Sequence, residues 1–293
     1  MVNQLSTLAS GGAPIVVDGG MGTLLQDNGL LDGGAGELWN VDRPDAIRSA
    51  HQAYAEAGAR ILTTNTFGGT RPRLDMHGLG ERVHELNAAA ARIARSVADE
   101  HGALVAGDLG PTGELMAPLG TMDAAEAQAI FEEQLTGLRD GGIDVVLIET
   151  MSDLAEAQAA VAAARAVVPE LPIIATMSFD TNLRTMMGVR PAEAVTALAA
   201  AGVDAVGANC GRGPEEMEAI AAQMAAARPD GVLLVAQSNA GLPQVVGDHF
   251  EYDASPADIA RHAEVLHDLG IDLVGGCCGS TPAHIAAVTQ ALA

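Results

Sequence analysis

The fold is indicated by the stretch Asp204-Ala-Val-Gly-Ala-Asn209-Cys210-Gly211, a short apolar run that ends in an amide, a thiol and a glycine. Nearly continuous apolar runs of this length are typical of parallel strands that are buried on both faces. The pattern recurs along the chain, and a longer alanine-rich stretch with helical periodicity follows each time. Eight strands are predicted in this way, at residues 15–18, 60–65, 103–107, 144–149, 172–178, 204–209, 232–236 and 271–275.

The segments between the predicted strands begin and end with helix signals. One begins near Pro44, carries Ile47, Ala50 and Tyr54 on one face, and stops at Gly58. This spacing is typical of a helix with one buried side, started by proline and ended by glycine. The chain therefore alternates strands with amphipathic helices.

Eight strand–helix units in order predict one (β/α)8 barrel, a TIM barrel of the α/β class, as a single domain over residues 1–293. An open doubly wound sheet is the alternative. Such a sheet normally has a G-x-G-x-x-G fingerprint after its first strand, and Gly19-Gly20-Met21-Gly22 does not match it. The barrel is therefore the preferred interpretation.

The composition excludes several functions. A formal charge of −23 argues against nucleic acid or an anionic membrane as a partner. All 15 basic residues are arginine, and the lack of lysine excludes Schiff-base aldolases, pyridoxal-phosphate enzymes and P-loop phosphotransferases. No signal peptide and no apolar segment of membrane-spanning length is evident, so we expect a cytoplasmic protein.

Polar and thiol side chains stand where the predicted strands end. Active sites of (β/α)8 barrels lie at the carboxyl ends of the strands. Because these ends meet on one face of the barrel, we expect their side chains to form one site. The residues at these ends are Asp18, Asn65, Asp108, Glu149, Ser178, Asn209, Cys210, Ser238, Asn239, Cys277 and Cys278.

The chain has three cysteines, Cys210 and the adjacent pair Cys277 and Cys278. Free cysteine is often only a small buried apolar side chain, and this alternative stays open for each of them. A disulfide framework is not expected in so long and cysteine-poor a chain. Three thiolates at strand ends can hold one zinc ion and leave its fourth position open, which is the mark of a catalytic zinc site.

These motifs resemble those of the homocysteine S-methyltransferases, a family whose barrel also forms the homocysteine-binding domain of cobalamin-dependent methionine synthase. The resemblance covers nearly the whole chain. Its most specific parts are G-x-N-C at 207–210 and G-G-C-C-G at 275–279. The other matching motifs are VDGGMGT at 17–23, TNTFG at 64–68, GPTG at 110–113, IET at 148–150, NAG at 239–241 and STP at 280–282.

The resemblance implies a zinc site and a substrate site. Cys210, Cys277 and Cys278 match the three zinc ligands of the family, and Asn239 falls where a residue close to the metal can fill its open position. Glu149 matches the carboxylate that binds the homocysteine ammonium. The remaining candidates for substrate contact are Asp18, Gly19 and Gly20, which match the loop that lines the amino-acid pocket, and Asn65 and Ser178 at the strand ends.

The expected function is zinc-dependent transfer of a methyl group to the thiolate of L-homocysteine, giving methionine. Zinc deprotonates a coordinating thiol, and the thiolate is the nucleophile. The donor stays open between a small onium compound (betaine, a sulfonium acid or S-methylmethionine) and a methyl-corrinoid protein as partner. The alternative is a zinc- and homocysteine-binding subunit without turnover of its own, or an excised module of a corrinoid-dependent methionine synthase.

Three segments fit the family pattern less directly. Gln237-Ser238-Asn239 lacks the proline that usually precedes the asparagine. Met186 and Met187 either line a donor pocket or fill gaps between other side chains. Residues 75–80 match the D-x-H-x-x-G pattern of corrinoid-binding domains, but their companion S-x-L at 152–154 comes far too late. We interpret this last match as a coincidence.

Overall fold

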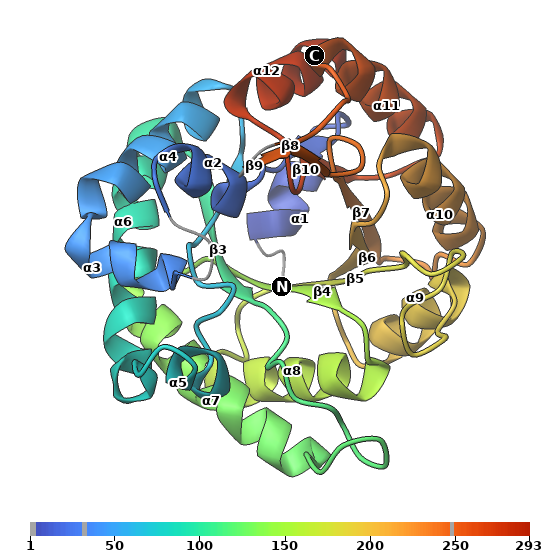
Figure 1. Ribbon diagram of the computed structural model, residues 1–293. Coiled ribbons are helices and arrows are strands. Elements are labelled where there is room, and N and C mark those ends of the chain that lie inside the picture. The colour runs from blue at the N-terminus through green and yellow to red at the C-terminus, as the bar shows by residue number, and fades with distance from the viewer. Residues whose placement is uncertain (1–3, 31–33, 247–248) are drawn as a thin grey trace.

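The computed structural model describes residues 4–30, 34–246 and 249–293. All eight predicted strands form, and they pair in parallel in the order β1-β10-β7-β6-β5-β4-β3-β2. Figure 1 shows them around one axis with the helices outside. The strands are β1 (Ile15–Val16), β2 (Ile61–Thr63), β3 (Leu104–Leu109), β4 (Val145–Met151), β5 (Ile173–Met177), β6 (Ala205–Cys210), β7 (Leu233–Ser238) and β10 (Leu273–Gly276).

The sheet closes where β1 meets β2. Val17 forms a parallel bridge to Ile61, and the Arg60 N–H donates to the Val16 carbonyl at 2.8 Å. On its other side β1 pairs with β10. The predicted barrel is thus confirmed over the open sheet, and the first and last strands of the chain are neighbours at its seam.

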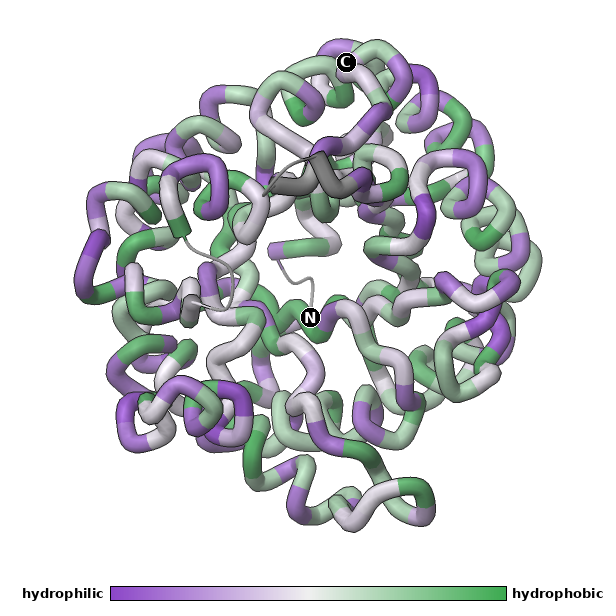
Figure 2. The backbone as a smooth tube through the Cα atoms, viewed as in Figure 1, coloured by the Kyte–Doolittle hydropathy of each residue, from purple (hydrophilic) through white to green (hydrophobic). Residues whose placement is uncertain are grey.

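The longer helices form the outer layer (Figure 1). Hydrophilic residues gather on their outer surface in Figure 2. In the predicted helix from Pro44, Ile47 and Tyr54 are fully buried. No described helix has the length and hydropathy needed to cross a membrane. The longer helices are α4 (Pro44–Glu56), α6 (Val83–His101), α7 (Ala124–Gly141), α8 (Leu154–Val167), α9 (Pro191–Ala200), α10 (Pro214–Ala226), α11 (Pro256–Asp268) and α12 (Pro282–Ala291).

Several short elements were not predicted. The helix α1 (Gln4–Ala9) lies inside the ring of strands in Figure 1, and its Leu5 is fully buried against the inward-facing side chains of the strands. The antiparallel pair β8 (Gln244–Val246) and β9 (His249–Glu251) is inserted between β7 and α11. The remaining short elements are α2 (Met21–Asp27), η1 (Gly36–Leu38), α3 (Trp39–Asp42), α5 (Arg71–Asp75) and η2 (Gly80–Arg82).

Three aspartates immediately precede the first residues of β4, β6 and β10, at the amino-terminal end of the barrel. The Oδ2 atom of each accepts a hydrogen bond from a backbone N–H at the start of the neighbouring strand and lies within ion-pair distance of an arginine. The sets are Asp144 with Val105 and Arg95, Asp204 with Ile173 and Arg165, and Asp272 with Leu234 and Arg228. We refer to them as the aspartate–arginine pairs; they fix neighbouring strands to each other and to the helix layer.

Candidate metal and substrate site

The three thiols converge at the carboxyl end of the barrel. Cys210 is the last residue of β6, and Cys277 and Cys278 follow β10, with one strand between them in the sheet. The three sulfur atoms lie within 4.8 Å of one another, and the Sγ atoms of Cys210 and Cys277 are 3.0 Å apart. The predicted convergence is therefore confirmed, and the set can hold one metal ion.

The backbone is strained beside these thiols. Cys210 has φ +62° and Thr150 has φ +59°, the left-handed region that side chains rarely adopt. Thr150 lies where the register between β4 and β5 shifts between Ile148 and Met151. Strain of this kind costs of the order of 1–3 kcal/mol per residue and is concentrated at functional sites.

Asn209 connects the thiols to β4 and β5. Its Oδ1 accepts hydrogen bonds from the Thr150 backbone N–H and the Thr176 hydroxyl, both at 2.8 Å. Its Nδ2 donates to the Thr150 hydroxyl at 2.6 Å and lies 3.5 Å from the Cys210 sulfur and 3.5 Å from a Glu149 oxygen. The sequence places Asn209 at a strand end but does not indicate this linking role.

The thiols share their protons unevenly. Hydrogen bonds from Cys210 and then Cys277 lower the pKa of Cys278 to about 3, and Tyr252 also donates to it. The pKa of Cys277 is raised, first because its thiol is hydrogen-bonded to Cys210 and then to Cys278. One thiolate therefore forms readily, and a bound dication would release the remaining protons.

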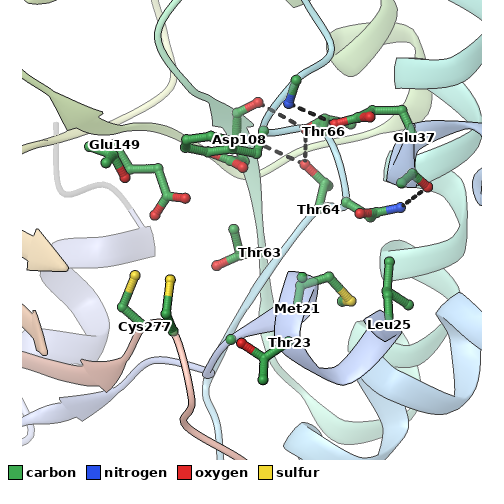
Figure 3. Close-up of a pocket in the computed structure, with 18 of the residues that line it drawn as sticks. Met21, Thr23, Leu25, Glu37, Thr63, Thr64, Thr66, Asp108, Glu149 and Cys277 are labelled. Carbon is green, nitrogen blue, oxygen red and sulfur yellow. Dashed lines mark hydrogen bonds between the residues drawn. The ribbon is translucent and has the colours of Figure 1, made fainter. Parts of the chain in front are cut away.

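A cavity of about 550 Å³ opens beside the sulfur atoms (Figure 3). Its walls come from the strand ends and the loops that follow them. Among the predicted residues, the cavity is lined by Asp18, Gly19, Gly20, Asn65, Asp108, Glu149, Cys210, Cys277 and Cys278. The barrel therefore brings most of the expected site together around one space.

Three of the carboxyl groups that line this cavity have raised pKa values. Burial raises the pKa of Asp18 to about 7, although its two oxygens accept hydrogen bonds from the backbone and hydroxyl of Thr63 at 2.7 Å. Burial, then Cys278 and Asp18, raise the pKa of Glu149 to about 8. Burial and then Glu149 raise the pKa of Asp108 well above its ordinary value. Each carboxyl would be stabilised in its charged form by a cationic ligand.

The loop after β1 touches the loop after β10 across the seam. A side chain at Gly20 would come within 2.7 Å of the Cys277 carbonyl oxygen, so only glycine fits this approach. The Gly20 N–H donates to the Ser280 carbonyl, and the Gly279 N–H donates to the Thr23 hydroxyl at 3.0 Å. These contacts fix the pocket loop relative to the adjacent cysteines.

Two predicted residues use their amides within the protein. The Asn65 Nδ2 donates to the Gly36 carbonyl at 2.8 Å, which orders one wall of the cavity. The Asn239 Oδ1 accepts from the Cys278 N–H at 3.0 Å, and its Nδ2 donates to the Gly211 carbonyl at 2.7 Å. Asn239 therefore joins the two cysteine loops; its proposed place in the metal shell stays a prediction.

Other expected residues lie outside the cavity walls. Ser178 follows β5 but is not among the residues that line the cavity, and neither are Met186 and Met187. Met186 is 70% exposed. Conversely, His77, from the segment that resembles a corrinoid motif, lines the cavity together with Arg73. No pattern in the sequence indicated these two basic side chains.

The fold and site define an α/β barrel with a cluster of three thiols, able to hold a metal ion, at the carboxyl end of its strands. The chain belongs to the homocysteine S-methyltransferase family, because the family model described as "Homocysteine S-methyltransferase" matches residues 15–292.

Known proteins resemble the chain over almost its whole length. It is 36% identical over 295 residues to the methionine synthase of Mycobacterium tuberculosis, covering 95% of the chain and 24% of that protein. The chain is also 36% identical over 305 residues to the methionine synthase of Mycobacterium leprae, covering 99% of the chain and 25% of that protein. The chain thus spans about a quarter of the length of these relatives.

Solved structures give the same picture. The oxidized form of the homocysteine methyltransferase MmuM from Escherichia coli matches with a TM-score of 0.81 and 26% identity, covering 98% of this chain and 99% of that one. The metallated form of MmuM matches with a TM-score of 0.80 and 24% identity, again covering 98% of this chain and 99% of that one. The likeness to MmuM extends over the complete barrel.

Proposed function

We propose that this chain transfers a methyl group to the sulfur of L-homocysteine, giving methionine, with a zinc ion held by Cys210, Cys277 and Cys278. The observation that carries the proposal is the convergence of the three thiols on a cavity that also holds Asp18 and Glu149. The relatives named methionine synthase and homocysteine methyltransferase support the same acceptor.

The thiol cluster fits zinc. Tetrahedral ligands at a Zn–S distance of about 2.3 Å lie about 3.8 Å apart, and the three sulfur atoms here lie within 4.8 Å of one another. Soft thiolate donors favour zinc over magnesium or calcium. Three protein ligands leave a fourth position on the zinc for the substrate sulfur. A homocysteine thiol bound at that position would be deprotonated near neutral pH.

The cavity residues would orient the amino acid. Glu149, which lines the cavity, would bind the homocysteine ammonium through charge-assisted hydrogen bonds. Asp18, held by Thr63 at 2.7 Å, adds negative charge to the same pocket. Gly19 and Gly20 line the same pocket, and their lack of side chains lets this loop pack closely against Tyr54 and the Cys277 carbonyl.

The reaction is a direct displacement on the methyl carbon. The homocysteine thiolate forms the new sulfur–carbon bond, and the leaving group of the donor departs with the electron pair of the bond that breaks. Asn209 would hold the Cys210 sulfur and Glu149 at a fixed separation. This would fix the homocysteine thiolate relative to its ammonium site, and orienting a reactant in this way supplies much of the rate in reactions of this kind.

The test compares zinc content, homocysteine binding and methionine formation in the purified, reduced chain and in Cys277→Ser. We expect about one zinc per chain in the unaltered protein, and in the variant a loss of zinc affinity of more than about a hundredfold, because even residues behind a ligand contribute tenfold to a hundredfold. Titration calorimetry without a donor measures homocysteine binding separately.

Met186→Ser is the matched control. It also removes a sulfur side chain from a loop at the carboxyl end of the barrel, but Met186 does not line the cavity. Zinc content and homocysteine affinity should be unchanged. Full zinc content and unchanged methionine formation in Cys277→Ser would refute the proposal.

A further inference from the structure

The connection between β7 and α11 holds Cys278 by each of its polar groups. The Cys278 N–H donates to the Asn239 Oδ1 at 3.0 Å, and its carbonyl accepts from the Ala240 N–H at 2.9 Å. Its sulfur accepts a hydrogen bond from the hydroxyl of Tyr252, the residue directly after β9. One connection therefore fixes both the backbone and the sulfur of this cysteine.

The Tyr252 ring lies on Gly279, the residue after Cys278. A Cβ at Gly279 would overlap this ring, and the glycine has φ +79°, so both the available space and the backbone conformation require a residue without a side chain. The ring is half-buried. A tyrosine in such a position satisfies its hydroxyl either in water or on a buried acceptor, and here the acceptor is the Cys278 sulfur.

The segment that carries Tyr252 is anchored at Ala254. The Ala254 N–H donates to the Ala240 carbonyl at 3.0 Å, and the Ala254 carbonyl accepts from the His284 Nε2 at 3.0 Å. The Thr281 N–H donates to the His284 Nδ1 at 3.1 Å, so the proton of this imidazole is on Nε2. These anchors, to the loop after β7 and to α12, restrict how far the Tyr252 hydroxyl can move from the sulfur.

A hydrogen bond to this sulfur matters because the site carries excess negative charge. Three thiolates exceed the charge of a zinc dication, and a substrate thiolate would add to the excess. The Asn209 Nδ2 lies 3.5 Å from the Cys210 sulfur and 3.8 Å from the Cys277 sulfur, and Tyr252 supplies the corresponding donor for Cys278. Groups behind a metal ligand fix its orientation and tune the metal.

We propose that Tyr252 is a positioning residue for the metal: its hydroxyl donates a hydrogen bond to the Cys278 sulfur while this sulfur ligates zinc, which fixes the direction of the ligand and offsets part of its negative charge. This inference rests on the proposed function. Tyr252 is not among the residues that line the cavity, so it acts on the substrate only through Cys278. The hydroxyl keeps its proton throughout, and no bond forms or breaks at Tyr252.

The test is Tyr252→Phe, which keeps the ring on Gly279 and removes only the hydroxyl. The probe is cobalt(II), whose bonds to thiolates absorb light in a charge-transfer band that zinc lacks. We expect the band of the variant at longer wavelength, because a sulfur without this hydrogen bond holds its electrons less tightly. Zinc affinity, measured by competition with a chelator, should fall about tenfold, as for other residues behind a metal ligand.

Tyr54→Phe is the matched control. The chain has two tyrosines, and the Tyr54 hydroxyl donates to the carbonyl of Ser280, two residues after Cys278, at 2.9 Å. This substitution removes a hydroxyl from the same loop without removing a hydrogen bond to sulfur. The charge-transfer band should therefore stay in place.

The outcomes separate this inference from the proposed function. An unmoved band or an unchanged zinc affinity in Tyr252→Phe, or an equal band shift in Tyr54→Phe, would each overturn the role of Tyr252. If the unaltered chain binds cobalt with a thiolate charge-transfer band, these results leave the proposed function standing. An unaltered, reduced chain that shows no such band refutes both.

Discussion

The two ends of the barrel use carboxyl groups in opposite ways. At the amino-terminal end, every member of the aspartate–arginine pairs has its partner, and each aspartate also holds a neighbouring strand. At the carboxyl end, Asp18, Asp108 and Glu149 face a cavity, and burial raises the pKa of each. The carboxyl groups at the amino-terminal end are paired with arginines and contribute to stability. The carboxyl groups at the other end line a cavity, where a cationic ligand could pair with them.

This contrast implies that the two ends respond differently to the loss of a carboxyl. Removing a paired aspartate leaves a partly exposed arginine without this acceptor and a backbone N–H without its partner. Removing an unpaired carboxyl relieves a cost that the fold bears when no ligand is present. Active sites commonly reduce the stability of the fold in this way.

The largest effect is expected for Glu149→Gln in the metal-free, ligand-free chain. The folded pKa of Glu149 is raised from 4.5 to about 8, so the wild type loses stability as pH rises through this window. Glutamine does not titrate, and the variant should be more stable at pH 7 by up to about 3 kcal/mol, less to the extent that Glu149 is solvated. Urea unfolding at pH 7 and at pH 4 measures the difference, which should nearly vanish at the lower pH.

Glu264→Gln, an exposed glutamate of α11, is the control and should change stability little at either pH. The same Glu149→Gln protein should bind homocysteine more weakly once zinc is restored. A variant that is less stable than wild type at pH 7 would contradict the distinction between the two ends.

Asp144→Ala should have the next largest effect, in the opposite direction. It removes the acceptor of the Val105 N–H at 2.8 Å and of Arg95 at 2.7 Å. We expect a loss of about 2 kcal/mol in the free energy of unfolding, with zinc content unchanged. Loss of zinc without loss of stability would show that the amino-terminal end also serves the site.

The smallest effect is expected for Asn209→Ser, which tests how the carboxyl end is ordered. It shortens the side chain that links the Cys210 sulfur to Thr150 and Thr176. Zinc affinity, measured by competition with a chelator, should fall about tenfold, as for other residues behind a metal ligand. Thr176→Val removes one of these bonds and leaves the amide in place, so its effect should be smaller; an equal or larger effect would argue against Asn209 as the positioning residue.

The sequence predicted the parts of the molecule that depend on chain periodicity. Each strand is a continuous apolar run, so all eight were found, and barrel geometry then required Cys210 to meet Cys277 and Cys278. The first helix was missed because six residues carry too weak a pattern, and the β8–β9 pair because its strands mix polar and apolar residues and lack a continuous apolar run.

Side-chain direction was the main quantity that the sequence could not predict. Ser178 and Asp108 both stand at strand ends, yet only Asp108 lines the cavity. The amides of Asn239 and Asn65 both donate to backbone carbonyls, a partnership that the sequence does not indicate, and the expected substrate contacts of the two residues stay predictions. Arg73 and His77 reach the cavity from a helix and loop outside the strands, where no periodicity indicates a site.

The pairing of β1 with β10 determines when the site forms during folding. Its pocket loop at Gly20 and its cysteines at 277–278 come from opposite parts of the sequence and touch only when the last strand pairs with the first. During synthesis, all eight barrel strands precede these two thiols. Contacts of such long sequence separation form late, because the chain must be closed before they stabilise it. High-affinity metal uptake is therefore a reporter of barrel closure, and a chain arrested before its last strand should not retain the ion.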